Sequence, residues 1–376
     1  MKSRYDTDSL GNYVKIRTGN LDANANDPKG IYPFFSCAVA PLRINSYSFD
    51  CECVLVAGNG DLNVKYYDGK FDAYQRTYVI ESLDKARLSP RYLFHFLSIY
   101  VQKLREMSIG GVIKYIKLNY LTDAEIPLPP LDEQQRIAAI LDKADSIRQR
   151  RQESICLTDE FLRSVFLDMF GDPITNPKRW PEVRLGDVIE GNPNNGIFRK
   201  NEEYGGDVPV VWVKELFAGY VIDTSSSVGL SPTAKEVEKY SLRRGDILFC
   251  RSSLKLGGIG YTNVYWGDNG KALFECHLIR VRPKPNIMNG VFYNFLLRQP
   301  GMRERIIKQS NTVTMSTIGQ DQVRDIKHYL PPIALQEKFA ACVLKLTEKQ
   351  NRKDAFGKLT DQLFNSLSTR AFRGEL

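Results

Sequence analysis

The chain has 376 residues, which is more than one ordinary domain needs and is enough for two or three. With 43% hydrophobic and 26% charged residues, it is too apolar for a disordered protein. Lys and Arg number 52 against 44 Asp and Glu, and the net charge of +8 favours an anionic partner such as nucleic acid. The three histidines, His95, His277 and His328, are too few to favour a histidine-based metal or acid–base enzyme.

The sequence contains no run of about 18 apolar residues, so no transmembrane span is predicted. The N-terminal residues lack the apolar segment of a signal peptide. The seven cysteines are scattered and odd in number, which indicates reduced thiols and a cytoplasmic protein. Cys51 and Cys53 form the closest pair, but no second pair lies at zinc spacing. We therefore predict no metal site and place these two thiols in a half-buried strand.

A long internal repeat organises the chain. Residues 128–137 (LPPLDEQQRI) recur as residues 330–339 (LPPIALQEKF), at an offset of 202 residues. The same offset continues without a gap and gives 13 identities in the 43 positions of 128–170. A looser match relates residues 10–13 to residues 185–188 near the start of each half. A period of this length is too long for a solenoid and indicates duplication of a whole module, with a pseudo-two-fold internal repeat.

Each copy of the repeat contains a long predicted helix. Residues 132–169 contain no Gly and no Pro, and their apolar residues recur at helical spacings of three, four and seven. Two prolines set the start of this helix and Gly171 sets its end. The second helix follows the second Pro-Pro pair. Because each helix has one apolar stripe, we predict that the two pack together in antiparallel, coiled-coil fashion; docking of each helix on its own domain is the alternative.

The remaining segments, residues 10–127 and 180–329, show short β-like runs separated by turn signals, with helical interludes. The runs are 53–56, 76–80, 208–213 and 246–250, the turns are 58–61, 68–69 and 267–270, and the helices are 90–106 and 289–308. The predicted fold class is therefore α+β, with two similar domains and two long helices. The predicted boundaries are 1–127 for the first domain, 128–170 for the first helix, 171–329 for the second domain and 330–376 for the second helix.

The motifs of common enzymes are missing from the sequence. There is no GxxxxGK[ST] phosphate loop and no amino-methyltransferase motif. Asp61 with Asp68 and Lys70 fits a metal-nuclease pattern only formally, because Asp68-Gly69 reads more simply as a turn. A duplicated, basic, non-catalytic scaffold suits two domains that each read a short stretch of duplex DNA, with the helices setting the gap. A coiled-coil assembly protein without DNA readout and a cryptic nuclease stay open at this point.

Two strings in the sequence resemble a known family. Residues 126–137 (IPLPPLDEQQRI) and 371–376 (AFRGEL) look like hallmarks of the specificity subunits of Type I restriction–modification systems, and Trp180 with residues 185–188 resembles the start of their recognition domains. The resemblance spans essentially the whole chain. It implies a non-catalytic, sequence-specific DNA-binding subunit with two target-recognition domains, which read the halves of a bipartite, asymmetric site. The recognition subunit of a Type II enzyme, whose partner both methylates and cleaves, is an alternative with the same sequence features.

The resemblance also implies partners for the chain. These are double-stranded DNA, two adenine methyltransferase subunits docked on the helices, and restriction subunits. S-adenosylmethionine, ATP and Mg²⁺ would be bound by those subunits, and no cofactor by this chain. The candidate partner-binding residues lie in the two Pro-Pro motifs: Leu128, Pro129, Pro130, Leu131, Gln134, Gln135, Leu330, Pro331 and Pro332. The first domain is shorter than the second and lacks a counterpart of Trp180, and the second motif is a weaker copy, so the sequence leaves open whether a partner docks there.

Two loops in each domain carry side chains suited to DNA, because bases are read by fixed donors and acceptors and phosphates are held by Lys, Arg, Ser and Thr. The candidates are Tyr74, Gln75, Arg76, Lys114 and Tyr115 in the first domain, and Arg251, Ser252, Ser253, Lys255, His277, Thr314 and Ser316 in the second. An ordinary solvated loop is the alternative for each, and a core histidine is the alternative for His277. Trp180, Trp212 and Trp266 are predicted to be core residues. The basic run 148–151 is either a solvated helix face or a phosphate contact.

Overall fold

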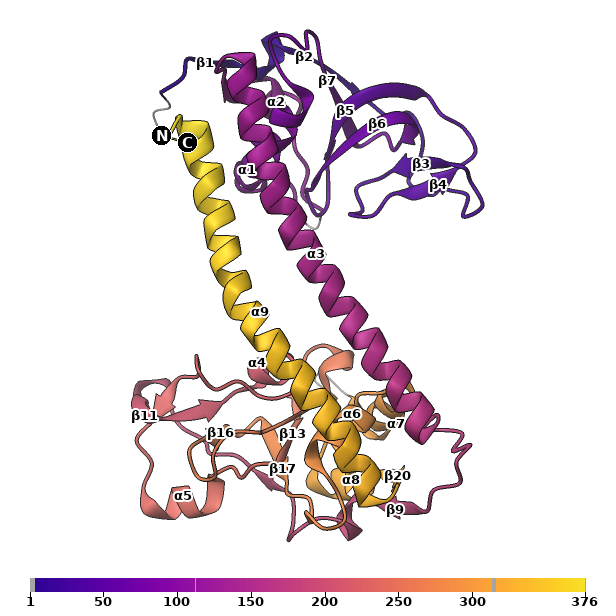
Figure 1. Ribbon diagram of the computed structural model, residues 1–376, viewed down its shortest axis with the longest axis vertical. Helices are drawn as coiled ribbons and strands as arrows, with labels where there is room; N and C mark the ends of the chain where they lie inside the picture. Colours follow the sequence, from indigo (N-terminus) through magenta and orange to yellow (C-terminus); the bar gives the residue numbers. More distant parts are fainter. Residues whose placement is uncertain (1–3, 112, 313–315, 376) are drawn as a thin grey trace. The chain divides into compact units, whose positions relative to one another are not determined.

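A computed structural model describes residues 4–111, 113–312 and 316–375. The chain divides into two compact units, the first comprising Met1–Gln152 and Ala355–Leu376 and the second Glu153–Asp354. Each unit contains part of two long helices, α3 (Leu131–Phe170) and α9 (Ile333–Arg373) (Figure 1). Both helices begin directly after their Pro-Pro pair, as predicted, and α3 ends directly before Gly171, which has a left-handed φ of 78°. The four predicted domain boundaries stay a prediction, because these two units cut across both helices.

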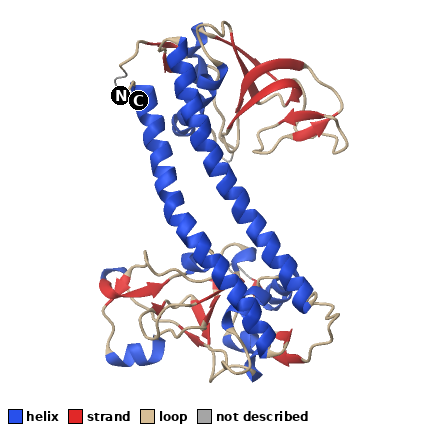
Figure 2. Cartoon of the chain, viewed as in Figure 1, coloured by secondary structure: helices blue, strands red, loops and turns tan. Residues whose placement is uncertain are grey.

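The first unit is built on a six-stranded sheet of order β2-β7-β5-β6-β3-β4, drawn as red arrows in Figure 2. Its strands are β2 (Val14–Thr18), β3 (Tyr32–Phe35), β4 (Leu42–Ile44), β5 (Phe49–Ala57), β6 (Val64–Ala73) and β7 (Thr77–Ser82). Strand β3 runs parallel to β6, and the other neighbours are antiparallel. Alternate residues of β5 enter two separate cores, Val54 and Val56 on one face and Cys53 and Leu55 on the other. The sheet is therefore covered on both faces.

Helix α1 (Pro90–Met107) covers one face of this sheet. It begins with proline at its first position and is capped by the Ser89 hydroxyl, which accepts a hydrogen bond from the Tyr92 N–H. Its buried residues, among them Tyr92, Leu93 and Leu97, share a core with Val54 and Val56. The short helix α2 (Asn119–Thr122) and the ladder of β1 (Thr7–Ser9) with β8 (Glu125–Pro127) complete the unit. Ile137, near the start of α3, belongs to the same core, so this core joins α1 to α3.

The second unit repeats this topology with more interruptions. Strands β10 (Asn194–Asn195), β17 (Leu278–Val281), β13 (Ile247–Cys250) and β15 (Thr262–Val264) form one sheet, and β12 (Gly229–Leu230), β11 (Tyr204–Val211) and β16 (Leu273–Phe274) form another, each in that order. Strand β11 runs parallel to β16, as β3 does to β6. Strands β15 and β16, with the loop between them, therefore correspond to the single strand β6. The helices of the unit are α4 (Val213–Leu216), α5 (Ala234–Tyr240), α6 (Gly290–Leu297), α7 (Pro300–Gln309) and α8 (Gln320–Arg324).

Three local predictions are wrong. The expected turn at Asp68-Gly69 lies inside β6, where these residues pair with Glu52 and Cys51 of β5, and glycine supports the φ of 129° found there. The expected helix 289–308 is two helices, because Pro300 ends the first and starts the second. The expected strand 208–213 ends at Val211, and Val213 begins α4. The predicted turn 267–270 exists, but its flanking strands β15 and β16 lie in different sheets, so it closes no hairpin.

The two long helices pack against each other and also dock on their own units, so both predicted arrangements occur. In the first unit, Ile137 and Leu141 near the start of α3 share a core with Ala371 near the end of α9. In the second unit, Phe166 near the end of α3 packs at 5.5 Å between ring centroids against Phe339 near the start of α9. Within each unit the helices are therefore antiparallel. The same residues also contact the sheet core of their own unit, so pairing and docking occur together.

One buried glutamine in each long helix makes the same set of hydrogen bonds. Gln134 Oε1 accepts from the Ser89 N–H at 2.9 Å, and its Nε2 donates to the carbonyls of Arg87 and Pro129, both at 2.9 Å. Gln336, 202 positions later, accepts from the Asn289 N–H at 2.9 Å and donates to Ile287 at 3.1 Å and Pro331 at 2.7 Å. Both side chains are buried. We call this arrangement the glutamine clamp, because it joins each Pro-Pro turn to the loop before α1 or α6.

A second repeated feature confirms the looser sequence match near the start of each half. Strand β9 (Glu182–Arg184) pairs with β20 (Lys327–Tyr329) as β1 pairs with β8. A 3₁₀ turn follows β1 and another follows β9. The Leu10 N–H donates to the Ala124 carbonyl, and the Leu185 N–H donates to the Ile326 carbonyl in the same way.

Among the helices that the structure describes, none combines the length and the apolar character that a membrane span requires.

The glutamine clamp predicts a large stability effect in the second unit. Gln336→Leu keeps the side-chain volume but leaves one buried N–H and two carbonyls unpaired, so the free energy of unfolding should fall by about 2–4 kcal/mol. All three tryptophans lie in the second unit, so tryptophan fluorescence during denaturation by urea reports its unfolding. The control Glu337→Ala changes an exposed neighbour and should shift the value by less than about 0.5 kcal/mol. Equal effects of the two variants would contradict the assigned role of the amide.

The buried histidine of β20 predicts an acid dependence of the same unit. Burial lowers the pKa of His328 to about 4 from the ordinary 6.5. Between about pH 6.5 and pH 4 the histidine is protonated in the unfolded chain but neutral in the folded unit. The free energy of unfolding therefore falls as the pH drops through this range, by about 3 kcal/mol in total. His328→Phe removes this titration and should flatten that part of the pH profile, measured by urea denaturation with tryptophan fluorescence. An unchanged slope in the variant would contradict the prediction.

Candidate nucleic-acid interface

Three loops of the first unit meet where β5 ends and β7 begins. They are residues 58–60, residues 74–76, and residues 109–111 with 113–115. The Gly58 N–H donates to the Arg76 carbonyl at 2.7 Å, the Ile116 N–H donates to the Gly58 carbonyl at 2.9 Å, and the Gly60 N–H donates to the Lys114 carbonyl at 2.9 Å. The two loops singled out from the sequence are therefore brought together, with a third between them. We call this group of loops the reading edge of the first unit.

The candidate side chains of this reading edge are accessible. Gln75, Arg76, Lys114 and Tyr115 are exposed, and Tyr74 is half-buried. Gln75 Nε2 donates to the Asp22 carboxylate at 3.1 Å, which restricts the position of its amide. A guanidinium, an ammonium, a phenol and an amide thus lie on one set of linked loops. These groups supply hydrogen bonds to phosphates and base edges.

The second unit has the same reading edge, held by the same backbone bonds. The Arg251 N–H donates to the His277 carbonyl at 2.7 Å, and the Ile318 N–H donates to the Arg251 carbonyl at 2.9 Å. Strand β14 (Ser252–Ser253) pairs with β19 (Ser316–Thr317), which also pairs with β18 (Asn311–Thr312). By these bonds Arg251 takes the place of Gly58, and His277 takes the place of Arg76.

The candidate side chains of the second reading edge differ in accessibility. Arg251, Lys255 and His277 are exposed, so the core alternative for His277 is wrong. Ser252 and Ser253 are half-buried, and the Ser253 hydroxyl donates to the Lys255 carbonyl at 2.7 Å. Ser316 is buried, so its expected contact with DNA is not supported by its position. Thr314, the remaining candidate, lies outside the described residues.

Sequence reasoning missed an apolar side chain on this edge. Leu254 is 85% exposed, directly beside Ser253 and Lys255. The side chain of Leu254 therefore buries almost no apolar surface when the chain folds. In a groove, an apolar side chain of this kind contacts the thymine methyl group. The sequence alone did not indicate that Leu254 is exposed, because a single leucine among Ser and Lys can also be buried where a loop approaches the core.

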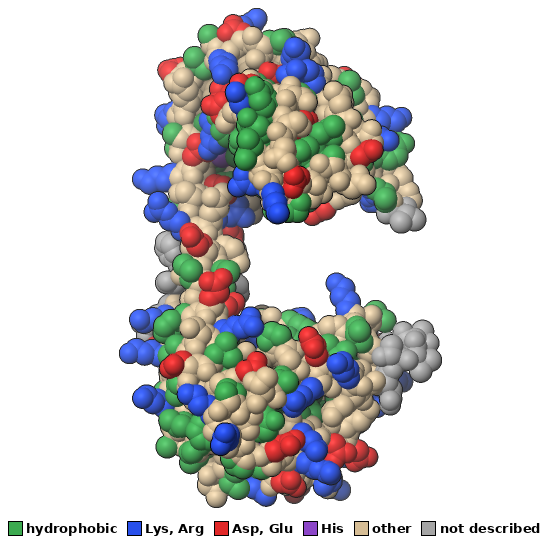
Figure 3. All heavy atoms as spheres, turned by 90° about the vertical axis from the view of Figure 1, so that its right-hand side faces the viewer, with side chains coloured by type: hydrophobic (Ala, Val, Ile, Leu, Met, Phe, Trp, Pro, Cys, Tyr) green, Lys and Arg blue, Asp and Glu red, His purple; other side chains and the backbone are tan. Residues whose placement is uncertain are grey.

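Basic side chains are mixed with acidic ones over the surface drawn in Figure 3, which shows one face of each unit. No field of a single sign dominates that face. Part of the positive charge is used internally. Arg282 forms hydrogen bonds of 2.7 and 2.8 Å with both carboxylate oxygens of Asp246, which is 1% exposed. The total of 52 Lys and Arg therefore overstates the number of positive side chains that are free to meet DNA.

The tryptophans and the basic run of α3 have structural contacts. Trp180, Trp212 and Trp266 are half-buried rather than fully buried, and Trp180 Nε1 donates to the Phe170 carbonyl at 3.0 Å. Arg148 lies 2.9 Å from a carboxylate oxygen of Asp361 in α9 of the same unit, and Arg151 lies 3.6 Å from the other oxygen. Arg148, Gln149 and Arg150 are exposed, which fits the solvated-face alternative, while Arg148 and Arg151 also pair with α9.

The Pro-Pro motifs expose only part of the predicted partner-binding set. In both motifs the first proline, Pro129 or Pro331, is buried, and the second, Pro130 or Pro332, is exposed. Gln135 is exposed, and Leu128, Leu131 and Leu330 are half-buried. Gln134 is buried in the glutamine clamp with three internal hydrogen bonds, so it is a structural residue and not the predicted partner-binding one.

The formal nuclease site is not assembled. Asp61 is exposed beyond the ends of β5 and β6 and lies 3.5 Å from Arg105. Asp68 is four residues beyond Val64 in β6, which corresponds to roughly 13 Å along the strand. The Lys70 ammonium lies 4.6 Å from the centre of the Tyr47 ring. Throughout the part of the chain that the structure covers, neither aspartate belongs to a group of three potential metal ligands.

Two similar α+β units, with equivalent loops that carry different donor side chains, define a protein with two recognition sites. Residues 3–156 and 177–354 match the family model described as the Type I restriction modification DNA specificity domain. The chain therefore belongs to the family of DNA specificity subunits of Type I restriction–modification systems, as the sequence motifs predicted. Sequence-specific recognition of DNA is its function, and neither the Type II alternative nor the assembly-protein alternative is favoured by the matches.

Individual relatives agree with this assignment. The Type I restriction enzyme EcoDI specificity subunit of Escherichia coli is 38% identical over 99% of this chain and 88% of its own length. The StySPI specificity subunit of Salmonella potsdam is 27% identical over 77% of this chain and 66% of its own length. The crystal structure of a Type I restriction–modification S subunit from M. genitalium is similar in fold, with a TM-score of 0.66 and 19% identity, over 98% of this chain and 96% of that one.

Proposed function

We propose that each unit reads one half of a bipartite, asymmetric DNA site through its reading edge. The observation that carries the proposal is the equivalence of the two edges. The same backbone hydrogen bonds hold three loops in each unit, while the side chains at equivalent places differ. Gly58 corresponds to Arg251, and Arg76 corresponds to His277. The two units share the arrangement of their loop backbones but carry different donor side chains on it, which supports the reading of two different half-sites.

The chemistry of the side chains supports particular roles. The guanidinium groups of Arg76 and Arg251 suit the two acceptors of guanine in the major groove, and the amide of Gln75 suits adenine. Lys114 and Lys255 suit phosphates, which fix the position of a protein on the duplex without reading sequence. Leu254 suits a thymine methyl group. These roles are consistent with the exposure of all six side chains.

The partners proposed for the chain are adenine methyltransferase subunits and restriction subunits. Two similar Pro-Pro motifs, each with an exposed second proline, support two methyltransferase subunits, one for each motif. The chain itself is proposed to be non-catalytic and cytoplasmic, where its DNA lies. S-adenosylmethionine, ATP and Mg²⁺ would then be bound by the partner subunits. The glutamine clamp is present in both motifs, so the weaker second copy keeps its local structure and remains a candidate for docking.

The first functional prediction is that each reading edge controls one half-site only. In the complex with its methyltransferase, Arg251→Ala should relax or change one position in one half of the methylated sequence, and Arg76→Ala one position in the other half. Each loss should correspond to about 1–3 kcal/mol, or roughly 10- to 100-fold in discrimination. Methylome sequencing of cells that express each complex measures both halves together.

Two controls separate reading from folding and from charge. Arg251→Lys keeps the positive charge but loses the two-pronged donor, so it should also relax the position. Lys271→Ala removes an exposed charge from the loop between β15 and β16 and should leave the methylated sequence unchanged. Relaxation of both halves by one edge variant, or of neither half, would contradict the assignment of one half-site to each edge.

The second functional prediction concerns the gap between the half-sites. We propose that the long helices set it. Four residues inserted into α3 between Gln152 and Glu153, with four inserted into α9 between Asp354 and Ala355, keep the helix pairing of both units and add about 6 Å. The gap in the methylated sequence should lengthen by about two base pairs, while both halves stay the same. A four-residue insertion in the loop 267–270 is the control and should leave the gap unaltered. An unaltered gap in the helix variant would show that the helices are not the ruler.

A further inference from the structure

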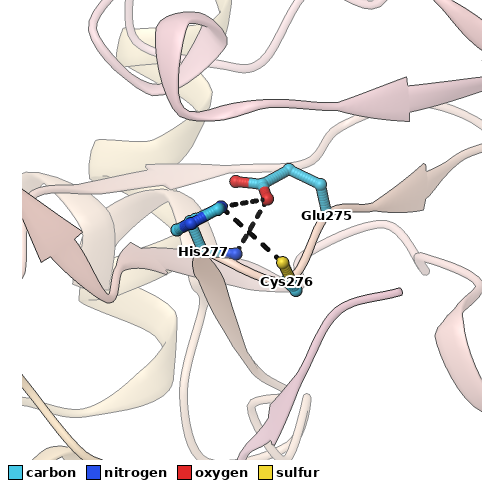
Figure 4. A group of neighbouring side chains, drawn as sticks. All are labelled: Glu275, Cys276 and His277. Carbon is cyan, nitrogen blue, oxygen red and sulfur yellow. Dashed lines mark hydrogen bonds and ion pairs between the residues drawn. The ribbon is translucent and has the colours of Figure 1, made fainter. Parts of the chain in front are cut away.

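Three consecutive side chains between β16 and β17 turn towards one another (Figure 4). Glu275 Oε2 accepts hydrogen bonds from the His277 backbone N–H at 2.8 Å and from ring Nδ1 at 2.7 Å. Cys276 Sγ lies 3.6 Å from the same Nδ1. One potential ligand atom from each residue lies within 4.8 Å of the others, and no other group of three was found among the residues described. The sequence predicted no metal site, because it offered no paired ligands at zinc spacing.

We infer that Glu275, Cys276 and His277 bind one divalent metal ion of the zinc class. The donors are a carboxylate oxygen, a sulfur and an imidazole nitrogen, a set that favours Zn²⁺ or Co²⁺ over Mg²⁺ and Ca²⁺. Three protein ligands leave a fourth position for water. This site goes beyond the proposed function and does not depend on it.

The spacing of the donors suits a tetrahedral ion. With metal bonds of about 2.0 Å to nitrogen and 2.3 Å to sulfur, a separation of 3.6 Å between Nδ1 and Sγ gives an angle of about 113° at the metal. The 2.7 Å between Nδ1 and Oε2 corresponds to about 80°, so this pair must open slightly when the proton between the two atoms is replaced by the metal. The exposed side chain of His277 allows that adjustment.

The carboxylate provides an independent indication of a bound cation. Glu275 is 2% exposed. Its Oε2 accepts the two hydrogen bonds from His277, while Oε1 is buried and has no hydrogen-bond partner within the described part of the chain. An ionised oxygen that is buried without a partner costs free energy. Because both oxygens belong to one carboxylate, a cation bound at Oε2 also lies beside Oε1 and offsets part of that cost. The chain thus holds a carboxylate with unused binding capacity beside a thiol and an imidazole.

The protonation change on binding is defined. The ordinary pKa of a cysteine thiol is about 8.5, so the Cys276 sulfur carries a proton at neutral pH before metal binds. On binding, the Sγ–H bond breaks, the proton passes to solvent, and the thiolate forms the bond to the metal. No electron is transferred, and no further reactant is required.

The first unit provides an internal comparison. Tyr74 and Glu275 take equivalent places, since Tyr74 forms an isolated parallel bridge with Leu21 and Glu275 forms one with Ile197. The loop of the first unit continues with Gln75 and Arg76, which offer no thiol, imidazole or carboxylate. The duplicated frame therefore contains the ligand set only once, and the chain should bind one equivalent of metal.

The test is a titration of the full-length chain, freed of metal and kept reduced, with Co²⁺ and then with Zn²⁺. We expect one equivalent to bind, with a sulfur-to-cobalt charge-transfer band in the near ultraviolet that Zn²⁺ abolishes by displacement. Cys276→Ser should remove that band and weaken binding at least tenfold, and His277→Ala should weaken binding to a similar extent. Cys156→Ser is the control, because Cys156 is an exposed cysteine of α3 and should leave both readouts unchanged.

Folding of each variant is checked by the fluorescence of the three tryptophans, all of which lie in the same unit as the site. The side chain of His277 is exposed, so His277→Ala tests the site without disturbing the core. Binding that persists unchanged in both Cys276→Ser and His277→Ala would overturn the inference. So would the absence of a charge-transfer band in the natural chain, or equal losses in Cys276→Ser and Cys156→Ser.

Discussion

Each unit depends on one buried amide. The Pro-Pro turn ahead of a long helix leaves a carbonyl that no backbone N–H of the turn can satisfy, since proline has no N–H to donate. Gln134 and Gln336 donate to that carbonyl and to a second one in a neighbouring loop, and they accept from the N–H of Ser89 or Asn289. Ser89 and Asn289 are the N-caps of α1 and α6. One side chain therefore fixes the long helix, the cap of the domain helix and, through the core of that helix, the sheet.

The duplication kept this frame and changed what the frame carries. Hydrogen bonds between loop backbones are the same in the two reading edges, because they depend on peptide groups and not on side chains. Side chains at those positions were therefore free to change, from Gly58 to Arg251 and from Arg76 to His277. The second unit also divides the strand β6 into β15 and β16 with a loop between them. A specificity subunit needs this combination, since the frame must stay constant while the bases that are read differ.

Charge has two uses in the chain. Arg148 and Arg151 pair with Asp361 within the first unit, and Arg282 pairs with the buried Asp246 in the second. Arginine suits such pairs because its planar group bonds to both oxygens of a carboxylate. The exposed Arg76, Arg251, Lys114 and Lys255 are then a small part of the basic total. Such a modest charge fits a subunit that selects a sequence while partner subunits add further contacts to the duplex.

The sequence by itself determined the duplicated organisation, the two long helices and their ends, and the family. These depend on local signals, namely an apolar repeat of helical period, Pro-Pro starts, a glycine stop, and a motif repeated at one offset. Only the tertiary structure decided that Gln134 is structural, that Asp68-Gly69 continues a strand, that Ser316 is buried, and that Glu275 joins Cys276 and His277. The first three depend on a partner distant in sequence or on burial, and the last depends on the turn of the backbone at residues 276–277. A glutamine that faces water and one that closes three buried hydrogen bonds look the same until the fold places their neighbours.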